Sequence, residues 1–222
     1  MNSFANIAIQ KARPLPVIIL ADTSGSMSEH GKIDALNTAL REMVRSFGEQ
    51  SRLNAEIHVG IITFGPEVVF HDIKPAYQYE KVPMFDAKGG TPLGQALALT
   101  QKIIEDGNLV PLRSYRPTIV VISDGMPTDS WEQPLLDFLT SEKASKSMRL
   151  AMGIGPDADK DMLAKFINDP AIPVIKGNDA RDIEKFLKCV STSVIQRSIK
   201  SNPNSIEKSA IVEIFEEEEL EF

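Results

Sequence analysis

The sequence predicts one α/β domain in which helices cover both faces of a mostly parallel, doubly wound central sheet with one antiparallel edge strand. Short apolar segments rich in β-branched residues alternate with longer segments whose apolar residues recur every three or four positions. This alternation is typical of parallel strands joined by right-handed crossover helices. A tight turn at Gly65 and Pro66 separates two further strand-like segments, which predicts a hairpin and hence the antiparallel strand.

The first half of the predicted domain contains three strands and two helices. Pro16 to Asp22 is too short for a helix and ends in a loop of glycine and serine, so we expect a buried strand. From Ile33 onward, apolar residues at helical spacing predict a helix that ends near Gly48. The predicted hairpin strands are Glu56 to Phe64 and Val68 to Ile73. After an irregular stretch, Pro92 suits the first position of a helix that ends at Gly107.

The second half continues the alternation. Pro117 to Asp124 reads as a buried strand, followed by a helix at Trp131 to Lys146 and a strand at Leu150 to Ile154. The remaining predicted elements are a short helix at Met162 to Ile167, a strand at Ile172 to Ile175 and a terminal helix at Ile183 to Ile195. We expect the domain to span residues 14–199, between an N-terminal extension of residues 1–13 and an acidic tail of residues 200–222.

The composition is typical of a soluble globular protein and excludes several other classes. Hydrophobic residues make up 42% and charged residues 25% of the 222 residues. Cys189 is the one cysteine, so no internal disulfide can form and we expect a reducing compartment, the cytoplasm by default. The apolar runs are far shorter than the roughly 20 residues that span a bilayer, and residues 1–13 lack the apolar centre of a secretory signal. We therefore expect a protein that is not integral to a membrane.

Most of the negative charge lies in the tail. Residues 200–222 hold two lysines and seven glutamates, so that a total formal charge of -7 leaves only -2 for the rest of the chain. Binding to nucleic acid draws its affinity from lysine and arginine, so this distribution argues against a nucleic-acid partner. Such a tail is most often a solvated, mobile end.

Polar side chains follow the first and fourth predicted strands, at the sheet edge where doubly wound folds bind ligands. The first of these loops carries Asp22, Ser24 and Ser26, and later loops carry Thr91 and Asp124. We expect them to converge as an all-oxygen site of two carboxylates and three hydroxyls. Such a site suits a hard divalent cation, best Mg²⁺, which keeps waters or an added ligand where a protein supplies few carboxylates.

Each of these residues also has a purely structural interpretation. Ser24 and Ser26 could cap a loop, Thr91 could cap the following helix, and Asp124 could cap the turn after its strand. Independent caps do not require all three segments to face one crevice, however. The metal site is therefore the preferred hypothesis.

The five positions resemble the metal-ion-dependent adhesion site (MIDAS) of the von Willebrand factor type A (VWA) family. The Asp-x-Ser-x-Ser motif is intact at Asp22, Ser24 and Ser26, and the family's threonine and second aspartate match Thr91 and Asp124. The resemblance covers roughly residues 14–199 and implies a Rossmann-like VWA fold. It also implies that the serines and the threonine contact Mg²⁺ or Mn²⁺, that the aspartates often act through water, and that an Asp or Glu of a protein partner completes the metal shell.

A narrower resemblance concerns three segments. Leu20 to Met27, Gly90 to Leu93 and Ser123 to Asp129 are most similar to bacterial VWA proteins associated with tellurium resistance. The resemblance implies a protein-binding module rather than an enzyme, acting as an adaptor in a bacterial stress or metal-resistance signalling system. A kinase or a phosphatase of the same system is then a candidate partner.

Three interpretations stay open. Met27 and Met126 flank the predicted metal and, with Gly90, form a candidate partner-binding rim, although ordinary loop packing explains the methionines equally well. In the tail, Glu216 to Glu219 could reach the metal in place of a partner, or the apolar run Ile211 to Phe215 could dock as a strand or partner motif. The alternative function is a magnesium-dependent phosphohydrolase, but the sequence offers no clear base or nucleophile for it.

Overall fold

The computed structural model describes residues 12–50, 54–205, 208–218 and 220–222. In it, six strands form one mixed sheet in the order β3-β2-β1-β4-β5-β6. The strands are β1 (Arg13–Asp22), β2 (Ala55–Phe64), β3 (Val68–Pro75), β4 (Thr118–Ser123), β5 (Met148–Ile154) and β6 (Ile175–Gly177). All neighbouring pairs are parallel except β2 with β3, which form the predicted hairpin. The predicted fold class is confirmed.

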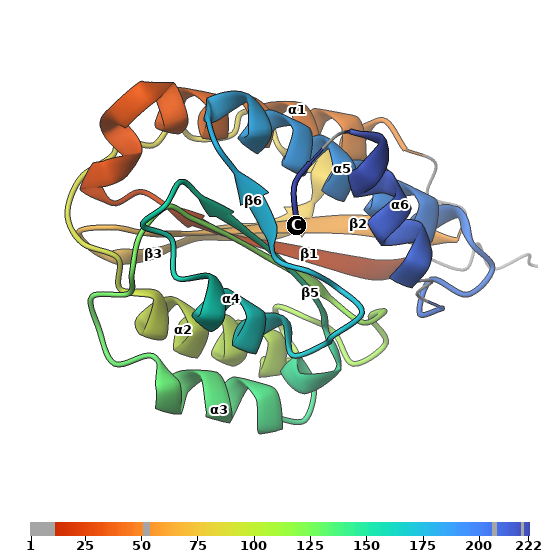
Figure 1. The fold of residues 1–222 in the computed structure, drawn as a ribbon. Helices are drawn as coiled ribbons and strands as arrows, with labels where there is room; N and C mark the ends of the chain where they lie inside the picture. Colours follow the sequence, from red (N-terminus) through yellow and green to blue (C-terminus); the bar gives the residue numbers. More distant parts are fainter. Residues whose placement is uncertain (1–11, 51–53, 206–207, 219) are drawn as a thin grey trace, which may run out of the picture.

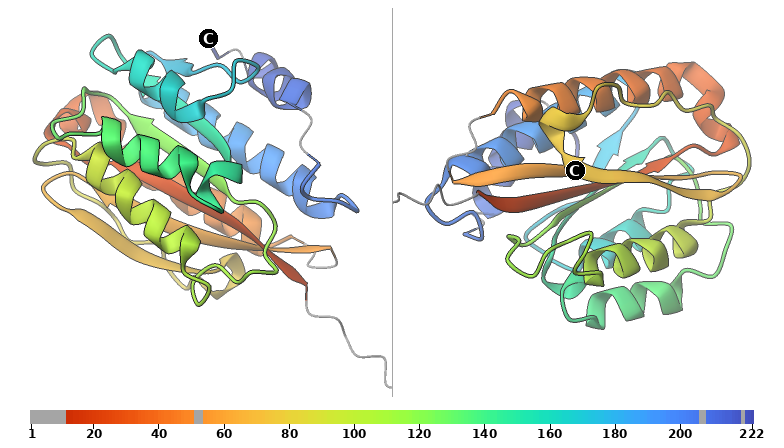
Figure 2. Two further views of the ribbon diagram at one scale, coloured as in Figure 1. Left: turned by 90° about the horizontal axis from the view of Figure 1, so that it is seen from below. Right: turned by 180° about the vertical axis from the view of Figure 1, so that it is seen from behind.

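Helices cover both faces of this sheet (Figure 1). They are α1 (Lys32–Gly48), α2 (Leu93–Glu105), α3 (Glu132–Thr140), α4 (Lys160–Ile167), α5 (Ala180–Ile199) and α6 (Lys208–Glu217). The helices α1 and α5 pack together on one face, and α2 packs with α3 on the other, beside α4 (Figure 2). Among the described residues, no helix is both long and apolar enough to span a bilayer.

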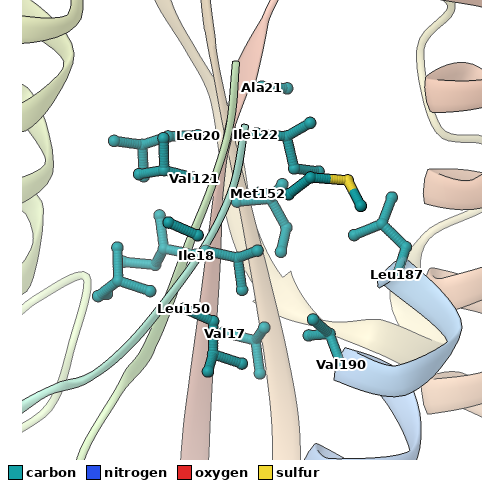
Figure 3. Packing of buried hydrophobic residues seen from close by; sticks show 14 of the residues in the cluster. Val17, Ile18, Leu20, Ala21, Val121, Ile122, Leu150, Met152, Leu187 and Val190 are labelled. Atoms are coloured by element: carbon teal, nitrogen blue, oxygen red, sulfur yellow. The ribbon is translucent and has the colours of Figure 1, made fainter. Parts of the chain in front are cut away.

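The strand β1 lies at the centre of the sheet, and every residue of it after Arg13 is buried. Its buried side chains point to both faces because alternate residues of a strand face opposite sides. Figure 3 shows Ile122 and Met152 directed towards Leu187 of α5, while Leu20 and Val121 point to the opposite face. The parallel pairing of β1 with β4 in this buried core brings the ends of the two strands side by side, and so the loops that follow them.

Several predicted elements have different limits in the structure, and two of these differences have a clear physical cause. The helix α3 ends at Thr140 rather than at Lys146, because the Glu105 carboxylate accepts hydrogen bonds from the backbone N–H groups of Lys143 and Ala144 and holds that segment outside the helix. The strand β6 begins only at Ile175, since Pro173 removes a backbone donor from the segment predicted as strand.

The acidic tail forms the helix α6, which packs on α5. The ring of Phe215 is buried and stacks on Phe186 with the centroids 5.8 Å apart. An ion pair adds to this contact, since Lys188 Nζ of α5 lies 2.5 Å from Glu218 Oε1. A second ion pair joins the start of α6 to the segment after α4, where Lys208 Nζ lies 2.5 Å from Asp169 Oδ2. The prediction of a solvated, mobile end is therefore wrong for residues 208–218, whose apolar side chains cover the domain as a helix.

The two edges of the sheet differ. At β6, the backbone N–H of Lys176 donates to the carbonyl of Glu221 at 2.9 Å, an isolated antiparallel bridge from the end of the chain. The β2–β3 pairing at the other edge contains a register shift between Ile61 and Ile62. The predicted extension of residues 1–13 lies almost wholly outside the described residues, apart from its last two positions.

Candidate metal centre

The loops that follow β1 and β4 begin side by side, because these strands are parallel neighbours that end at the same sheet edge. From β1 the chain passes to β2 on one side of it and later returns to β4 on the other side. Doubly wound sheets bind ligands where the strand order reverses in this way. The topology therefore places Asp22 and Asp124 at the expected binding edge.

Hydroxyl and carboxylate oxygens from both loops meet there. Ser24 Oγ and Ser26 Oγ lie 3.1 Å apart, and Ser26 Oγ donates a hydrogen bond to Asp124 Oδ1 at 2.6 Å. Ser24 and Asp124 are buried, at 2% and 3% exposure. Three of the five predicted residues are thus joined by direct contacts across 98 positions of sequence.

Asp22 is anchored beneath this cluster and is fully buried. Its Oδ1 accepts a hydrogen bond from the backbone N–H of Ser24 at 2.8 Å, and its Oδ2 accepts one from Ser123 Oγ at 2.6 Å. Burial raises the pKa of Asp22 to about 6, against the two serine hydrogen bonds that lower it, and the nearby Asp124 raises it further. Asp22 therefore carries a costly charge that a bound cation would compensate.

Thr91 approaches the same edge from the loop before α2. Its backbone N–H donates to Thr128 Oγ1, and the backbone N–H of Thr128 donates back to the Thr91 carbonyl, both at 2.9 Å. A β-carbon at Gly125 would lie 3.6 Å from Thr91 Oγ1, so this hydroxyl borders the Asp124 loop. The backbone N–H of Gly25 donates to the Gly89 carbonyl at 3.0 Å, which ties the first loop to the Thr91 loop.

Asp129 holds the helix that follows Thr91, and its removal should loosen the site. Its two carboxylate oxygens accept hydrogen bonds from the backbone N–H groups of Gly94 and Gln95 at 3.0 and 2.9 Å.

Asp129→Ala should lower the free energy of unfolding by about 1 kcal/mol, the usual cost of a lost helix cap, and weaken Mn²⁺ binding. Denaturant unfolding and Mn²⁺ titration measure both quantities, with the exposed Asp137→Ala as control. Unchanged Mn²⁺ affinity in folded Asp129→Ala would contradict a role in placing Thr91.

This oxygen set fits a small divalent cation. In an octahedral Mg²⁺ site with bonds of about 2.0–2.1 Å, adjacent ligands lie about 2.9 Å apart, close to the 3.1 Å between Ser24 Oγ and Ser26 Oγ. No group of three or more His, Cys, Asp or Glu side chains able to hold a metal exists among the described residues. A metal here would thus be held mainly by hydroxyl oxygens with two carboxylates nearby.

Residues 17–126 match the family model of the von Willebrand factor type A domain. The chain contains a VWA domain. The matched range runs from β1 to just past Asp124 and includes all five positions of the candidate metal centre. VWA domains often mediate metal-dependent protein interactions. A search of curated proteins by sequence finds no match to the chain.

Solved structures share the fold of this VWA domain at low sequence identity. The pilus adhesin SpaC from Lactobacillus rhamnosus GG has a TM-score of 0.67 at 16% identity, over 84% of this chain and 30% of that one. Proximal thread matrix protein 1 (PTMP1) from the mussel byssus, whose structure has a zinc-occupied MIDAS motif, has a TM-score of 0.60 at 16% identity, over 84% and 48%. The ArnB paralog VWA2 from Sulfolobus acidocaldarius has a TM-score of 0.60 at 14% identity, over 84% and 46%. This chain spans less than half the length of each of these three chains.

Of the three residues predicted to form a rim on the VWA domain, two are accessible. Met126 is 67% exposed beside Asp124, and Gly90 is exposed too. Met27 is fully buried, because the short 3-10 helix at Gly25–Gly31 turns its side chain into the core. Met27 is therefore a packing residue, and the other two remain the candidate rim.

Two further residues at this centre, Ser123 and Lys32, are not among the five predicted from the sequence. Ser123 binds Asp22, as described above, and Lys32 at the start of α1 places Nζ 2.6 Å from Asp124 Oδ2. Ser123 could have been found, since it adjoins Asp124 at the end of β4. For Lys32 the sequence offers no comparable signal, since 92 positions separate it from Asp124.

Proposed function

We propose that this VWA domain binds Mg²⁺ or Mn²⁺ through Ser24, Ser26 and Thr91, with Asp22 and Asp124 compensating its charge, and thereby binds a protein partner. An Asp or Glu of the partner completes the metal shell. The observation that carries the proposal is the pair of serine hydroxyls 3.1 Å apart, one of them hydrogen-bonded to the buried Asp124 carboxylate. Beside this site, the exposed residues Gly90 and Met126 form the rim at which a partner could approach the metal.

The chemistry of this donor set favours an added carboxylate. Hydroxyl ligands are neutral, so a divalent ion that they hold keeps much of its positive charge. Mg²⁺ also keeps exchangeable waters where a protein supplies few ligands. A carboxylate that replaces one of these waters gains both charge attraction and a metal bond, so partner affinity depends on the metal.

The proposed setting is a bacterial stress or tellurium-resistance-type signalling system in the cytoplasm. It is supported by the similarity of the three loop segments to bacterial proteins of that kind and by a lone cysteine, Cys189, that lies buried. A kinase or phosphatase of the same system is the proposed partner, and the VWA domain acts as the adaptor.

No specific observation favours the phosphohydrolase alternative. Hydrolysis would need a general base or a nucleophile besides the metal. Among the described residues, the two oxygens of Asp22 accept hydrogen bonds from Ser24 and Ser123. The two oxygens of Asp124 accept hydrogen bonds from Ser26 and Lys32. Neither carboxylate therefore has an oxygen without a partner that could act as the base or nucleophile.

Removing both serine hydroxyls should weaken metal binding strongly. We expect Ser24→Ala/Ser26→Ala to weaken Mn²⁺ affinity by about 100-fold or more, since even the loss of an indirect support costs 10- to 100-fold in metal sites. Ser28→Ala is the matched control, because Ser28 lies in the same segment but donates to the Gly25 carbonyl. Titration calorimetry with Mn²⁺ measures the affinities.

Wild type, the double variant Ser24→Ala/Ser26→Ala and the control Ser28→Ala also test partner binding. Wild type and Ser28→Ala should capture a common protein from a lysate with Mg²⁺ but not with EDTA, and the double variant should capture it in neither condition. Absence of Mn²⁺ binding by the wild type would overturn the metal site. Capture that is independent of Mg²⁺ would overturn the metal-dependent module.

A further inference from the structure

Lys32, the first residue of α1, reaches into the candidate metal centre. Its Nζ lies 2.6 Å from Asp124 Oδ2 and 3.4 Å from the Ser26 carbonyl oxygen. The Lys32 side chain is 13% exposed and that of Asp124 is 0% exposed. This is a largely buried ion pair in which one member is a predicted metal-site residue.

The backbone before α1 sets this geometry. His30 and Gly31 both have positive φ, at 53° and 73°, and turn the chain so that Lys32 is the first residue of α1. A cation at the start of a helix is unfavourable, because the helix dipole presents its positive end there. The ion pair with Asp124 offsets that cost, so the position of the Lys32 ammonium group depends on the Asp124 carboxylate.

We propose that Lys32 is a tethered cation that competes with the divalent metal for Asp124 and so sets the metal affinity of the site. The inference rests on the proposed metal-binding function and adds a residue that opposes it. It assigns Lys32 neither as a ligand nor as a partner contact.

The competition follows from the contacts of Asp124. One of its oxygens accepts from Ser26 Oγ and the other from Lys32 Nζ. A divalent ion bound by Ser26 Oγ lies next to the same carboxylate and repels the ammonium group. The long, flexible lysine side chain can swing away, but the buried ion pair is then lost. Each metal that binds must therefore displace Lys32 from Asp124.

Replacing the ammonium group should tighten metal binding. With Mn²⁺ as the probe and the free ion measured by electron paramagnetic resonance, we expect Lys32→Met to bind about tenfold more tightly than wild type. Lys32→Arg keeps the charge and should stay within about threefold of wild type. Lys88→Met removes an equal charge from the exposed loop before Thr91 and should change the affinity less than about twofold. Thermal unfolding verifies that each variant is folded, and Lys32→Gln serves as a second neutral variant.

A double-mutant cycle separates competition from simple repulsion through space. In an Asp124→Asn background the carboxylate is gone, so Lys32→Met should no longer tighten Mn²⁺ binding. A tenfold gain that persists in this background would overturn the competition. Equal or weaker binding by Lys32→Met and Lys32→Gln in the wild-type background would overturn the inference while leaving the metal site intact. If neither the wild type nor Lys32→Met binds Mn²⁺, the proposed function fails together with the inference.

Discussion

Asp22→Asn should make the VWA domain more stable without metal and unresponsive to Mg²⁺. Burial raises the pKa of Asp22 from 3.8 to about 6, so at pH 7 the folded protein holds a charge that the unfolded chain would solvate better. A shift of this size corresponds to about 3 kcal/mol. Asparagine keeps an oxygen for the Ser24 N–H and offers an N–H to Ser123 Oγ, so it fills the same place without the charge.

The pH dependence of this difference has a definite sign. A carboxyl group with a raised pKa in the folded state favours folding while it is protonated, below the unfolded pKa of about 3.8, and that contribution is lost as the pH rises through 6. In EDTA, the advantage of Asp22→Asn should therefore be about 3 kcal/mol at pH 7 and shrink towards pH 4.

Denaturant unfolding from pH 4 to pH 7.5 measures this advantage, and melting with added Mg²⁺ measures the metal response. Asp86→Asn, an exposed residue of the loop before Thr91, is the control and should differ little from wild type at any pH. A variant Asp22→Asn that is less stable than wild type at pH 7 in EDTA would contradict the account of Asp22 as a costly charge.

The second large effect is expected at Phe215. This ring is 1% exposed and stacked on Phe186, and truncation of a buried phenylalanine to alanine usually costs about 3–5 kcal/mol. Phe215→Ala should lower the free energy of unfolding by that amount. The exposed Glu216→Ala on the same helix is the control and should change it by less than about 0.5 kcal/mol.

A free energy of unfolding of Phe215→Ala within about 0.5 kcal/mol of that of wild type would show that α6 does not stabilise the domain.

The contribution of α6 to stability also affects how the idea that the tail occupies the metal site can be tested. Glu218 pairs with Lys188 on α5 in the structure, and truncation after Ser205 would expose the apolar surface beneath α6. A tail deletion therefore tests autoinhibition only if a folded variant such as Glu218→Gln is measured beside it.

The sequence was sufficient for the sheet because its signals are local. Each strand is a short apolar run and each crossover helix has apolar residues at helical spacing, so the succession of elements, the mostly parallel direction and the hairpin follow from the chain itself. For α6 the same signal existed, since Ile211, Ile214 and Phe215 have helical spacing. The glutamates around them dominated the interpretation, although Glu213, Glu216 and Glu217 line the exposed face of a helix whose other face is buried.

At the metal centre, the motif predicted the residues that converge but not how they are supported. Ser24, Ser26 and Asp124 are in contact as expected. Lys32 and Asp129 act through distances of 92 and 35 positions along the chain, and such pairings depend on how the loops fold over the sheet. The wrong prediction for Met27 has the same origin, since the turn that buries it is set by the 3-10 helix and not by the motif.

The two sheet edges also have a consequence for self-association. An uncovered edge strand offers its backbone groups to other chains and invites edge-to-edge aggregation. The bridge between Lys176 and Glu221 occupies part of the β6 edge, so growth of the sheet from that side requires the segment around Glu221 to detach. At β3, the irregular pairing at Ile61 and Ile62 and the charged pair Asp72 and Lys74 work against a flat, regular template. The molecule thus protects part of one edge with the segment around Glu221 and the other edge with an irregular pairing and charge.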